Sequence, residues 1–236
     1  MAEADPYIRR YELDGLLSDD LLAALRPRRS DPGDYIIRSG DPVSDVMFFV
    51  EGRAKAYGIM DNGQSILAAF YTPFDVFGEA ELFSTKHYAL TVEAISSSVC
   101  LCLSVEVMLK AAPRNYRLFM YLCGRLGSKL TDRFTADSVN LRYSVESRLA
   151  SYLLASADAE GGLVGTDALG ELADFIGASY RQLARVVHRF REEGILDPSR
   201  GRIRVLDGTK LAALAGDSYV QTGSVMKPGS FGRRDS

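Results

Sequence analysis

The chain has 236 residues, of which 47% are hydrophobic and 25% are charged, and its formal net charge at pH 7 is −3. This composition is normal for a globular protein and leaves room for two domains. No apolar run approaches the ~18 residues needed to cross a bilayer, the N-terminus has no hydrophobic signal core, and three cysteines do not make a disulfide framework. We therefore expect a cytoplasmic protein with no membrane partner.

The N-terminal half reads as a short helix followed by many short strands. The segment from Ser18 to Leu25 predicts a short amphipathic helix. From Gly33 to about Glu106, β-rich runs alternate with turn residues. The runs are Tyr35–Ile37, Val46–Val50, Arg53–Met60, Ser65–Tyr71, Ala89–Ile95 and Val99–Leu103. Asn62-Gly63 is the strongest hairpin signal, because both residues tolerate the positive φ of a type I′ turn. Over residues 1–112 we predict an antiparallel β-roll, jelly-roll-like.

A long helix is predicted after Pro113, over residues 113–137. An apolar residue recurs every fourth position for about five turns without a proline. This row consists of Leu118, Leu122, Leu126, Leu130 and Phe134. The row either packs on the chain's own roll or forms a dimer interface, and we favour the dimer. Asp137 to Tyr143 is the expected hinge into a further helix, Val145 to Ala157.

The most informative stretch lies between Leu169 and Gly194. Its first half has apolar residues on one helical face, namely Leu169, Leu172, Ala173 and Ile176. Gly177 suits the left-handed end of a helix, and Ser179 with Gln182 forms a capping box that starts another. The second helix has a buried row, Leu183, Val186, Val187 and Phe190, and a solvent-facing row, Arg181, Arg185, His188 and Arg189. Two such helices predict a helix-turn-helix, whose second helix enters the DNA major groove.

The residues that follow favour DNA binding over an ordinary helical hairpin with a basic surface. Ile195 and Leu196, turn residues, and then Ile203 to Leu206 predict a β-hairpin wing. Between Ser179 and Leu206, seven arginines stand against three carboxylates, although the whole chain is acidic. Positive charge is thus concentrated where phosphate contact requires it. We predict a winged helix-turn-helix domain over residues 138–215 and a disordered tail over residues 216–236, which makes the whole chain an α+β protein.

The order of these parts resembles the catabolite activator and fumarate/nitrate reductase regulator (Crp/Fnr) family over about residues 31 to 206. The resemblance rests on Gly40-Asp41, Glu51-Gly52, Gly78-Glu79, and Gly177 to Arg181 followed by Arg185. It implies a homodimeric transcription regulator, more often an activator, that binds double-stranded DNA and contacts RNA polymerase. In such a protein the roll senses a signal and the long helix relays it to the DNA-binding domains.

The resemblance also implies DNA contacts. These are expected from Ser179, Tyr180, Arg181, Gln182, Arg185 and Arg189, and from Arg200 and Arg202 of the wing. Arg185 matches the family pattern, and an arginine can bind guanine O6 and N7 with two hydrogen bonds. Arg181 stands where many members have a glutamate that reads cytosine. We therefore expect a different half-site sequence.

An effector pocket is expected around Gly78, Glu79, Tyr88 and Ala89. In cyclic-nucleotide-binding members the glutamate holds the ribose hydroxyl and an Arg-Ser pair follows, whose arginine holds the phosphate. Here Tyr88-Ala89 occupies the place of that pair. A buried cyclic phosphate without a charged donor loses its main attraction, so we expect that cyclic AMP is not the effector. The effector, and whether one is needed, stays open, and the sequence identifies no cofactor.

Other chemistries find less support in the residue types. Cys100, Cys102 and Cys123 are expected to be small buried hydrophobes, with a redox role as the alternative. No cysteine precedes Cys100, which argues against a cluster of the iron-sulfur type. His87 and His188 are too few for a metal cage. We therefore expect no metal and no catalytic activity; a cupin-like metal enzyme and a ligand-binding module that does not act on DNA are the alternatives.

Overall fold

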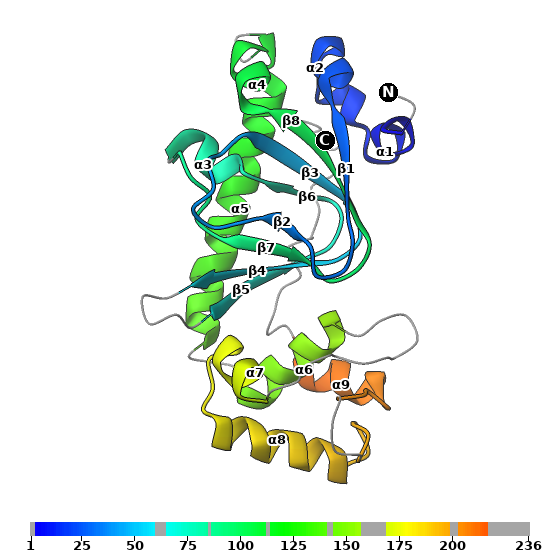
Figure 1. Ribbon diagram of the computed structural model, residues 1–236, viewed down its shortest axis with the longest axis vertical. Helices are drawn as coiled ribbons and strands as arrows, with labels where there is room; N and C mark the ends of the chain where they lie inside the picture. Colours follow the sequence, from blue (N-terminus) through cyan, green and yellow to red (C-terminus); the bar gives the residue numbers. More distant parts are fainter. Residues whose placement is uncertain are drawn as a thin grey trace, which may run out of the picture. The chain divides into compact units, whose positions relative to one another are not determined.

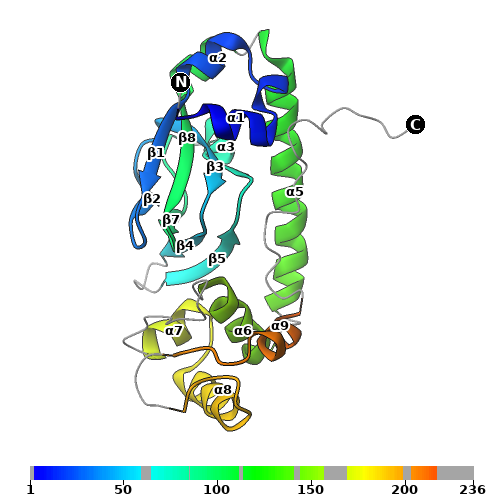
Figure 2. The same cartoon turned by 90° about the vertical axis from the view of Figure 1, so that its right-hand side faces the viewer.

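The computed structural model describes residues 3–59, 65–84, 86–111, 114–140, 144–156, 169–198 and 203–216, without the side chains of 66, 67, 132–140, 155, 156, 171, 174 and 175. The described chain divides into two compact units. One comprises residues 3–55 and 71–132, and the other comprises 56–70 and 133–216. Figures 1 and 2 give the elements of both units. In the part of the chain that is described, no helix is long and apolar enough to span a membrane.

The β-roll is built from two four-stranded sheets (Figure 1). The first sheet has the order β1 (Arg26–Ser30), β8 (Ser98–Ser104), β3 (Asp45–Glu51) and β6 (Asp75–Phe77). The second has the order β2 (Tyr35–Ile37), β7 (Thr91–Ala94), β4 (Ala54–Ile59) and β5 (Ser65–Tyr71). Strand β8 pairs antiparallel with both β1 and β3, and β2 pairs antiparallel with β7. The antiparallel, jelly-roll-like architecture is confirmed.

All six predicted strands are present, with ends within two residues of the prediction. Strands β1 and β6 were not predicted. Strand β1 reads Arg-Pro-Arg-Arg-Ser, which lacks the apolar alternation of a half-buried strand, and it lies at the edge of its sheet, where a proline is tolerated. Pairing with the buried β8 holds it in place. The Asn62-Gly63 turn lies outside the described residues, but β4 and β5 on either side of it are neighbours in the sheet.

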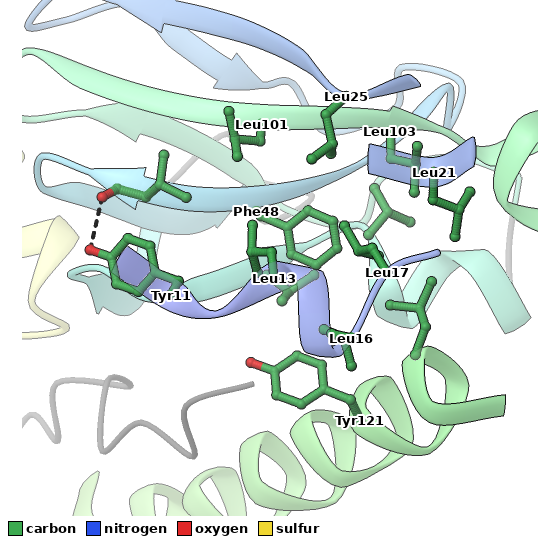
Figure 3. Packing of buried hydrophobic residues seen from close by; sticks show 14 of the residues in the cluster. Tyr11, Leu13, Leu16, Leu17, Leu21, Leu25, Phe48, Leu101, Leu103 and Tyr121 are labelled. Carbon is green, nitrogen blue, oxygen red and sulfur yellow. Dashed lines mark hydrogen bonds between the residues drawn. The ribbon is translucent and has the colours of Figure 1, made fainter. Parts of the chain in front are cut away.

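Helices at the N-terminus close one side of the first sheet. These are α1 (Asp5–Tyr11), the 3-10 helix η1 (Leu13–Gly15) and α2 (Asp19–Ala24), of which only α2 was predicted. Figure 3 shows Leu13 and Leu17 beside Phe48 of β3, and the Tyr11 hydroxyl donates to the Val50 carbonyl at 2.9 Å. The buried apolar residues of this segment therefore extend the core of the roll.

Three further helices follow along the chain: α3 (Glu79–Ser84), α4 (Val105–Ala111) and α5 (Tyr116–Asn140), of which α5 crosses from the first unit into the second at residue 133. The predicted long helix is confirmed as α5, which runs beside the roll (Figure 2). It continues to Asn140, so the first four residues of the predicted hinge are helical. Helices α3 and α4 were not predicted, because each is only six or seven residues long and shows too few periods of a helical pattern.

The apolar row of α5 does not form one continuous surface. Leu118 and Leu122 are fully buried in the core of their own chain, so the prediction that they lie in a dimer interface is wrong. A four-residue step turns about 40° further than one helical turn, so the row winds around the helix. Leu126 is half-buried and Leu130 is 57% exposed. The side chain of Phe134 lies outside the description.

A different row of α5 is exposed between residues 116 and 130. Its members follow one another at alternating steps of four and three residues, which is the spacing of a heptad seam. This row, which we call the exposed stripe, consists of Tyr116, Met120, Cys123, Gly127 and Leu130. The sequence pattern therefore identified the correct helix but not its outward face.

Leu122→Ala tests the burial of this side chain. We expect it to lower the free energy of unfolding by about 2 to 5 kcal/mol, because it removes a fully buried side chain and leaves a cavity. Urea unfolding at a fixed protein concentration measures the change. The control Leu109→Ala changes a half-exposed leucine of α4 and should stay within about 0.5 kcal/mol of the wild type. Equal effects of the two variants would contradict the assignment.

The cysteines differ in their environments. Cys100 and Cys102 lie on β8 and are buried, whereas Cys123 is exposed, so the expectation of three buried thiols is wrong for Cys123. Burial raises the pKa of the Cys100 thiol, and burial also raises that of Cys102 to about 11. Both thiols are therefore protonated at neutral pH and poor nucleophiles.

We expect Cys100 and Cys102 to resist alkylation in the folded protein. An ordinary thiol has a pKa of about 8.5 and is partly ionised at about pH 8, but the raised pKa values keep these two in the unreactive form. Iodoacetamide labelling followed by peptide mass spectrometry measures this, with protein unfolded in guanidinium as the control. Labelling at the same rate in both states would refute the protection.

Candidate nucleic-acid interface

The described residues of the second unit form four helices in addition to the end of α5 and the strand residues between 56 and 70. These are α6 (Val145–Ser156), α7 (Leu169–Phe175), α8 (Tyr180–Glu192) and α9 (Gly208–Ala215). Helix α7 packs on α8, and α6 contacts both α8 and α9. Helices α6, α7 and α8 were predicted, whereas α9 was not. Thr166 or Asp167 is the N-cap that the sequence predicts for α7, and both residues lie outside the described part of the chain.

A glycine turn joins α7 to α8. Gly177 has a φ of +67°, as predicted for a left-handed helix end, and the Ala178 N–H donates to the Ala173 carbonyl at 2.8 Å. The guanidinium of Arg148 from α6 donates to the carbonyls of Ile176 at 2.7 Å and Gly177 at 3.2 Å. Two carbonyls of the turn after α7 are therefore held by α6.

The capping box at the start of α8 is confirmed. The hydroxyl oxygen of Ser179 accepts from the backbone N–H of Gln182 at 3.3 Å, and the side-chain oxygen of Gln182 accepts from the N–H of Ser179 at 3.1 Å. This reciprocal pair satisfies backbone donors that the first turn of a helix leaves free. It sets where α8 begins.

Helix α8 has two distinct faces. Leu183, Val187 and Phe190 are fully buried, while Val186 of the predicted row is only half-buried. The opposite face exposes Arg181, Arg185, His188 and Arg189, as predicted. Tyr180 at the first position is 60% exposed. The apolar face holds the helix while its cationic face stays in water.

The cations of α8 differ in what they already bind. Among the described residues, Arg181 and Arg185 have no carboxylate partner. Arg189 pairs with Glu146 of α6 and lies 3.9 Å from Glu193. Two guanidinium groups spaced four residues apart are therefore free for an anionic partner in the first two turns of α8.

The predicted wing forms around one antiparallel bridge between Leu196 and Val205. The Asp197 N–H donates to the Arg204 carbonyl at 2.9 Å, and the Leu206 N–H donates to the Ile195 carbonyl at 2.8 Å. The hairpin is thus shorter than the two strands expected. Its tip, with Arg200 and Arg202, lies outside the described residues.

The residues expected around an effector pocket have partners within the roll. Gly78 has a φ of +84°, and a Cβ there would lie 2.7 Å from the Asp45 carbonyl oxygen, so only glycine fits. The Tyr88 hydroxyl donates to the same carbonyl at 2.7 Å, and burial raises its pKa. The Ala89 N–H donates to Glu81 at 3.1 Å. The neutral phenol of Tyr88 therefore occupies the position at which cyclic-nucleotide-binding members have an arginine that binds phosphate.

Glu79 binds a cation from α5 that the sequence analysis missed. Its carboxylate is 3% exposed and accepts from the Lys129 ammonium at 2.6 Å. Lys129 also lies 3.1 Å from Asp75, and Arg125 donates to Asp75 at 2.9 Å. These four side chains form one ion-pair cluster, with both cations on α5 and both carboxylates on the roll side. In the sequence, the signal that could have pointed to this cluster is the four-residue spacing of Arg125 and Lys129, which places both cations on one face of the helix.

Burial and charge act in opposite directions on this cluster. Burial raises the pKa of Glu79, and Lys129 opposes that change. Burial alone lowers the pKa of Lys129, but the carboxylates of Asp75 and Glu79 outweigh burial and raise it. In the described ranges, no group of three or more histidine, cysteine or carboxylate residues is arranged to hold a metal ion.

Comparison with protein families matches both units. Residues 27–115 match the model of the cyclic nucleotide-binding domain, and residues 147–214 match that of the Crp-like helix-turn-helix domain. The two matches together cover about two thirds of the chain. They coincide with most of the β-roll and with the helices that present α8.

Individual relatives agree with the family models. Regulatory protein YeiL of Escherichia coli O157:H7 is 28% identical over 182 residues, which are 77% of this chain and 82% of YeiL. Transcriptional activator protein FnrA of Stutzerimonas stutzeri is 25% identical over 219 residues, 89% of this chain and 86% of FnrA. A solved structure described as a transcriptional regulator of the Crp/Fnr family from Eubacterium rectale has a TM-score of 0.71 and 20% identity, covering 87% of this chain and 99% of that chain. This chain belongs to the Crp/Fnr family of DNA-binding transcription regulators.

Proposed function

We propose that the protein is a homodimer that reads an inverted DNA repeat with one α8 helix from each copy. The observation that carries this is the pair Arg181 and Arg185, which lie exposed and without a carboxylate partner among the described residues. They sit on a helix whose opposite face is fully buried. Paired recognition helices read half-sites about 34 Å apart on DNA.

The side chains divide into base-reading and phosphate-binding groups. Arg185 lies one turn beyond Arg181 and is proposed to bind guanine O6 and N7, while Arg181 and Tyr180 contact bases nearer the helix start. Ser179, Gln182 and Arg189 are proposed to contact phosphates, and Arg200 and Arg202 do so from the wing. For Arg189, a phosphate would have to replace Glu146 as the partner of the guanidinium.

The exposed stripe of α5 is the proposed dimer interface. Its spacing repeats as in a coiled coil, and a second copy of the same helix presents the same spacing. Met120 and Leu130 are large apolar side chains left in water in the single chain. A partner helix would bury both, and glycine at 127 permits close approach.

We base the remaining assignments, which concern location, activity and partners, on the family and on its bacterial relatives. We propose a cytoplasmic activator without catalytic activity that contacts RNA polymerase, because FnrA is named a transcriptional activator. The proposed sensor is residues 1–112, the proposed dimerisation segment is 113–137, which contains most of α5, and the proposed DNA-binding domain is 138–215. The predicted tail, 216–236, lies outside the described residues from 217 onward. Signals act by changing how α5 packs on the roll, which sets the spacing of the two α8 helices. Cyclic AMP is not the proposed signal, because Tyr88 replaces a charged donor.

Selection of genomic DNA fragments by the purified protein tests DNA reading, with Arg185→Ala as the variant. We expect the wild type to enrich an inverted repeat whose affinity falls steeply with salt. Arg185→Ala should reduce discrimination at one base pair in each half-site by about 1 to 3 kcal/mol.

The matched control is Arg9→Ala, which removes an exposed arginine of α1 and leaves α8 untouched. It should preserve the selected sequence. If Arg185→Ala selects the same sequence with the same preference at every position, Arg185 does not read a base.

Leu130→Glu tests the exposed stripe. Two copies of this carboxylate would meet across the dimer axis, so we expect the variant to sediment as a monomer and to bind the full repeat more weakly. Leu109→Glu is the control, because Leu109 is exposed on α4 and outside the stripe. A Leu130→Glu protein that sediments as the wild type does would exclude the stripe as the interface.

A further inference from the structure

The β-roll contains a site shaped for a primary ammonium group. The Lys129 nitrogen donates to Glu79 at 2.6 Å and to the Val76 carbonyl at 2.5 Å, and it lies 3.1 Å from Asp75. The rings of Tyr71 and Phe77 have their centroids 5.3 Å and 5.9 Å from the same nitrogen. Carboxylates, a carbonyl and aromatic faces are the partners that an ammonium ion prefers.

The acidic walls of this site come from the roll and its adjacent helix α3. Asp75 is on β6 and Glu79 starts α3, and their side chains are 0% and 3% exposed. Unpaired, two such carboxylates would be costly to bury. Arg125 pairs with Asp75, and Lys129 is the cation that Glu79 contacts.

We propose that Lys129 is the resident ligand of this ammonium site, so that α5 is seated on the roll and the DNA-reading form is present without an effector. The chain thus supplies from its own helix the cation that Glu79 requires. A ligand that approaches Glu79 with a hydroxyl group would have to displace a tethered ammonium already bound to three oxygen atoms. The proposal rests on the proposed function, because its readout includes DNA binding.

The first experiment measures whether Lys129 and Glu79 act as a pair. We expect Lys129→Met to lower the melting temperature of the full chain by about 10 °C, because it leaves Glu79 buried without its cation. The double variant Glu79→Gln with Lys129→Met removes both charges and should recover most of that loss. The control is Lys110→Ala, which changes an exposed lysine of α4 and should have the same melting temperature as the wild type. Losses that simply add in the double variant would overturn the pairing.

Chemical rescue separates an ammonium site from a merely structural lysine. Lys129→Ala removes three carbons and the nitrogen, which n-propylammonium can replace. We expect n-propylammonium to raise the melting temperature of Lys129→Ala and to restore its affinity for the selected DNA. Propan-1-ol has the same length without the charge and should do neither. Equal effects of the two compounds, or none from n-propylammonium, would overturn the assignment.

DNA affinity without added small molecules tests effector independence. We expect the wild type to bind its selected repeat unaided and with no more than about a twofold change on addition of cyclic AMP. We expect Lys129→Ala to bind at least about tenfold more weakly at a temperature where it is folded. Unweakened binding by folded Lys129→Ala would overturn the inference.

The two proposals fail in different ways. If the wild type binds the repeat only after cyclic AMP is added, the resident-ligand inference fails and the regulator function stands. If no DNA is selected under either condition, the proposed DNA reading fails. Melting of the single and double variants still tests the pairing in that case, because melting needs no DNA.

Discussion

Burial of one face of α5 against its own roll is the constraint on which the rest of the structure depends. Leu118 and Leu122 fill the core beneath the helix, and Arg125 and Lys129 neutralise carboxylates of the roll on the same side. Since those side chains are already in contact within the chain, the exposed stripe is the part of the described helix that remains for the proposed pairing. The buried side is where the roll contacts α5.

In the DNA-binding unit, the side chains that fix α8 in place differ from those proposed to contact DNA. Leu183 and Phe190 fix α8 by burial, and the capping box of Ser179 and Gln182 fixes where it starts. Arg181 and Arg185 on its other face have no carboxylate partner among the described residues, so they can vary without disturbing that packing. Arg189 differs, because it pairs with Glu146 of α6. This division lets an acidic protein keep its cations where phosphate groups approach, and it makes the family fold compatible with many half-site sequences.

Local chemistry in the sequence identified the helix-turn-helix, because the positive φ of Gly177 and the reciprocal bonds of Ser179 and Gln182 depend on neighbouring residues alone. Six of the eight described strands of the roll were predicted for the same reason. What could not be predicted depends on distant partners. Strand β1 has no apolar pattern and exists because β8 pairs with it. Lys129 looks like an ordinary surface lysine until Glu79, 50 residues earlier, is placed beside it.

The hydrogen bonds of Arg148 to the α7–α8 turn link α6 to the start of α8. Its guanidinium binds the carbonyls of Ile176 and Gly177, so α6 and the turn move together. Bending the turn alone would break these two hydrogen bonds, so they tie the start of α8 to α6. Arg181 and Arg185, the proposed base-reading residues, take no part in these bonds, so substitutions there leave the link between α6 and α8 unchanged. How α8 is held and which DNA sequence the proposed function reads can therefore change independently in evolution.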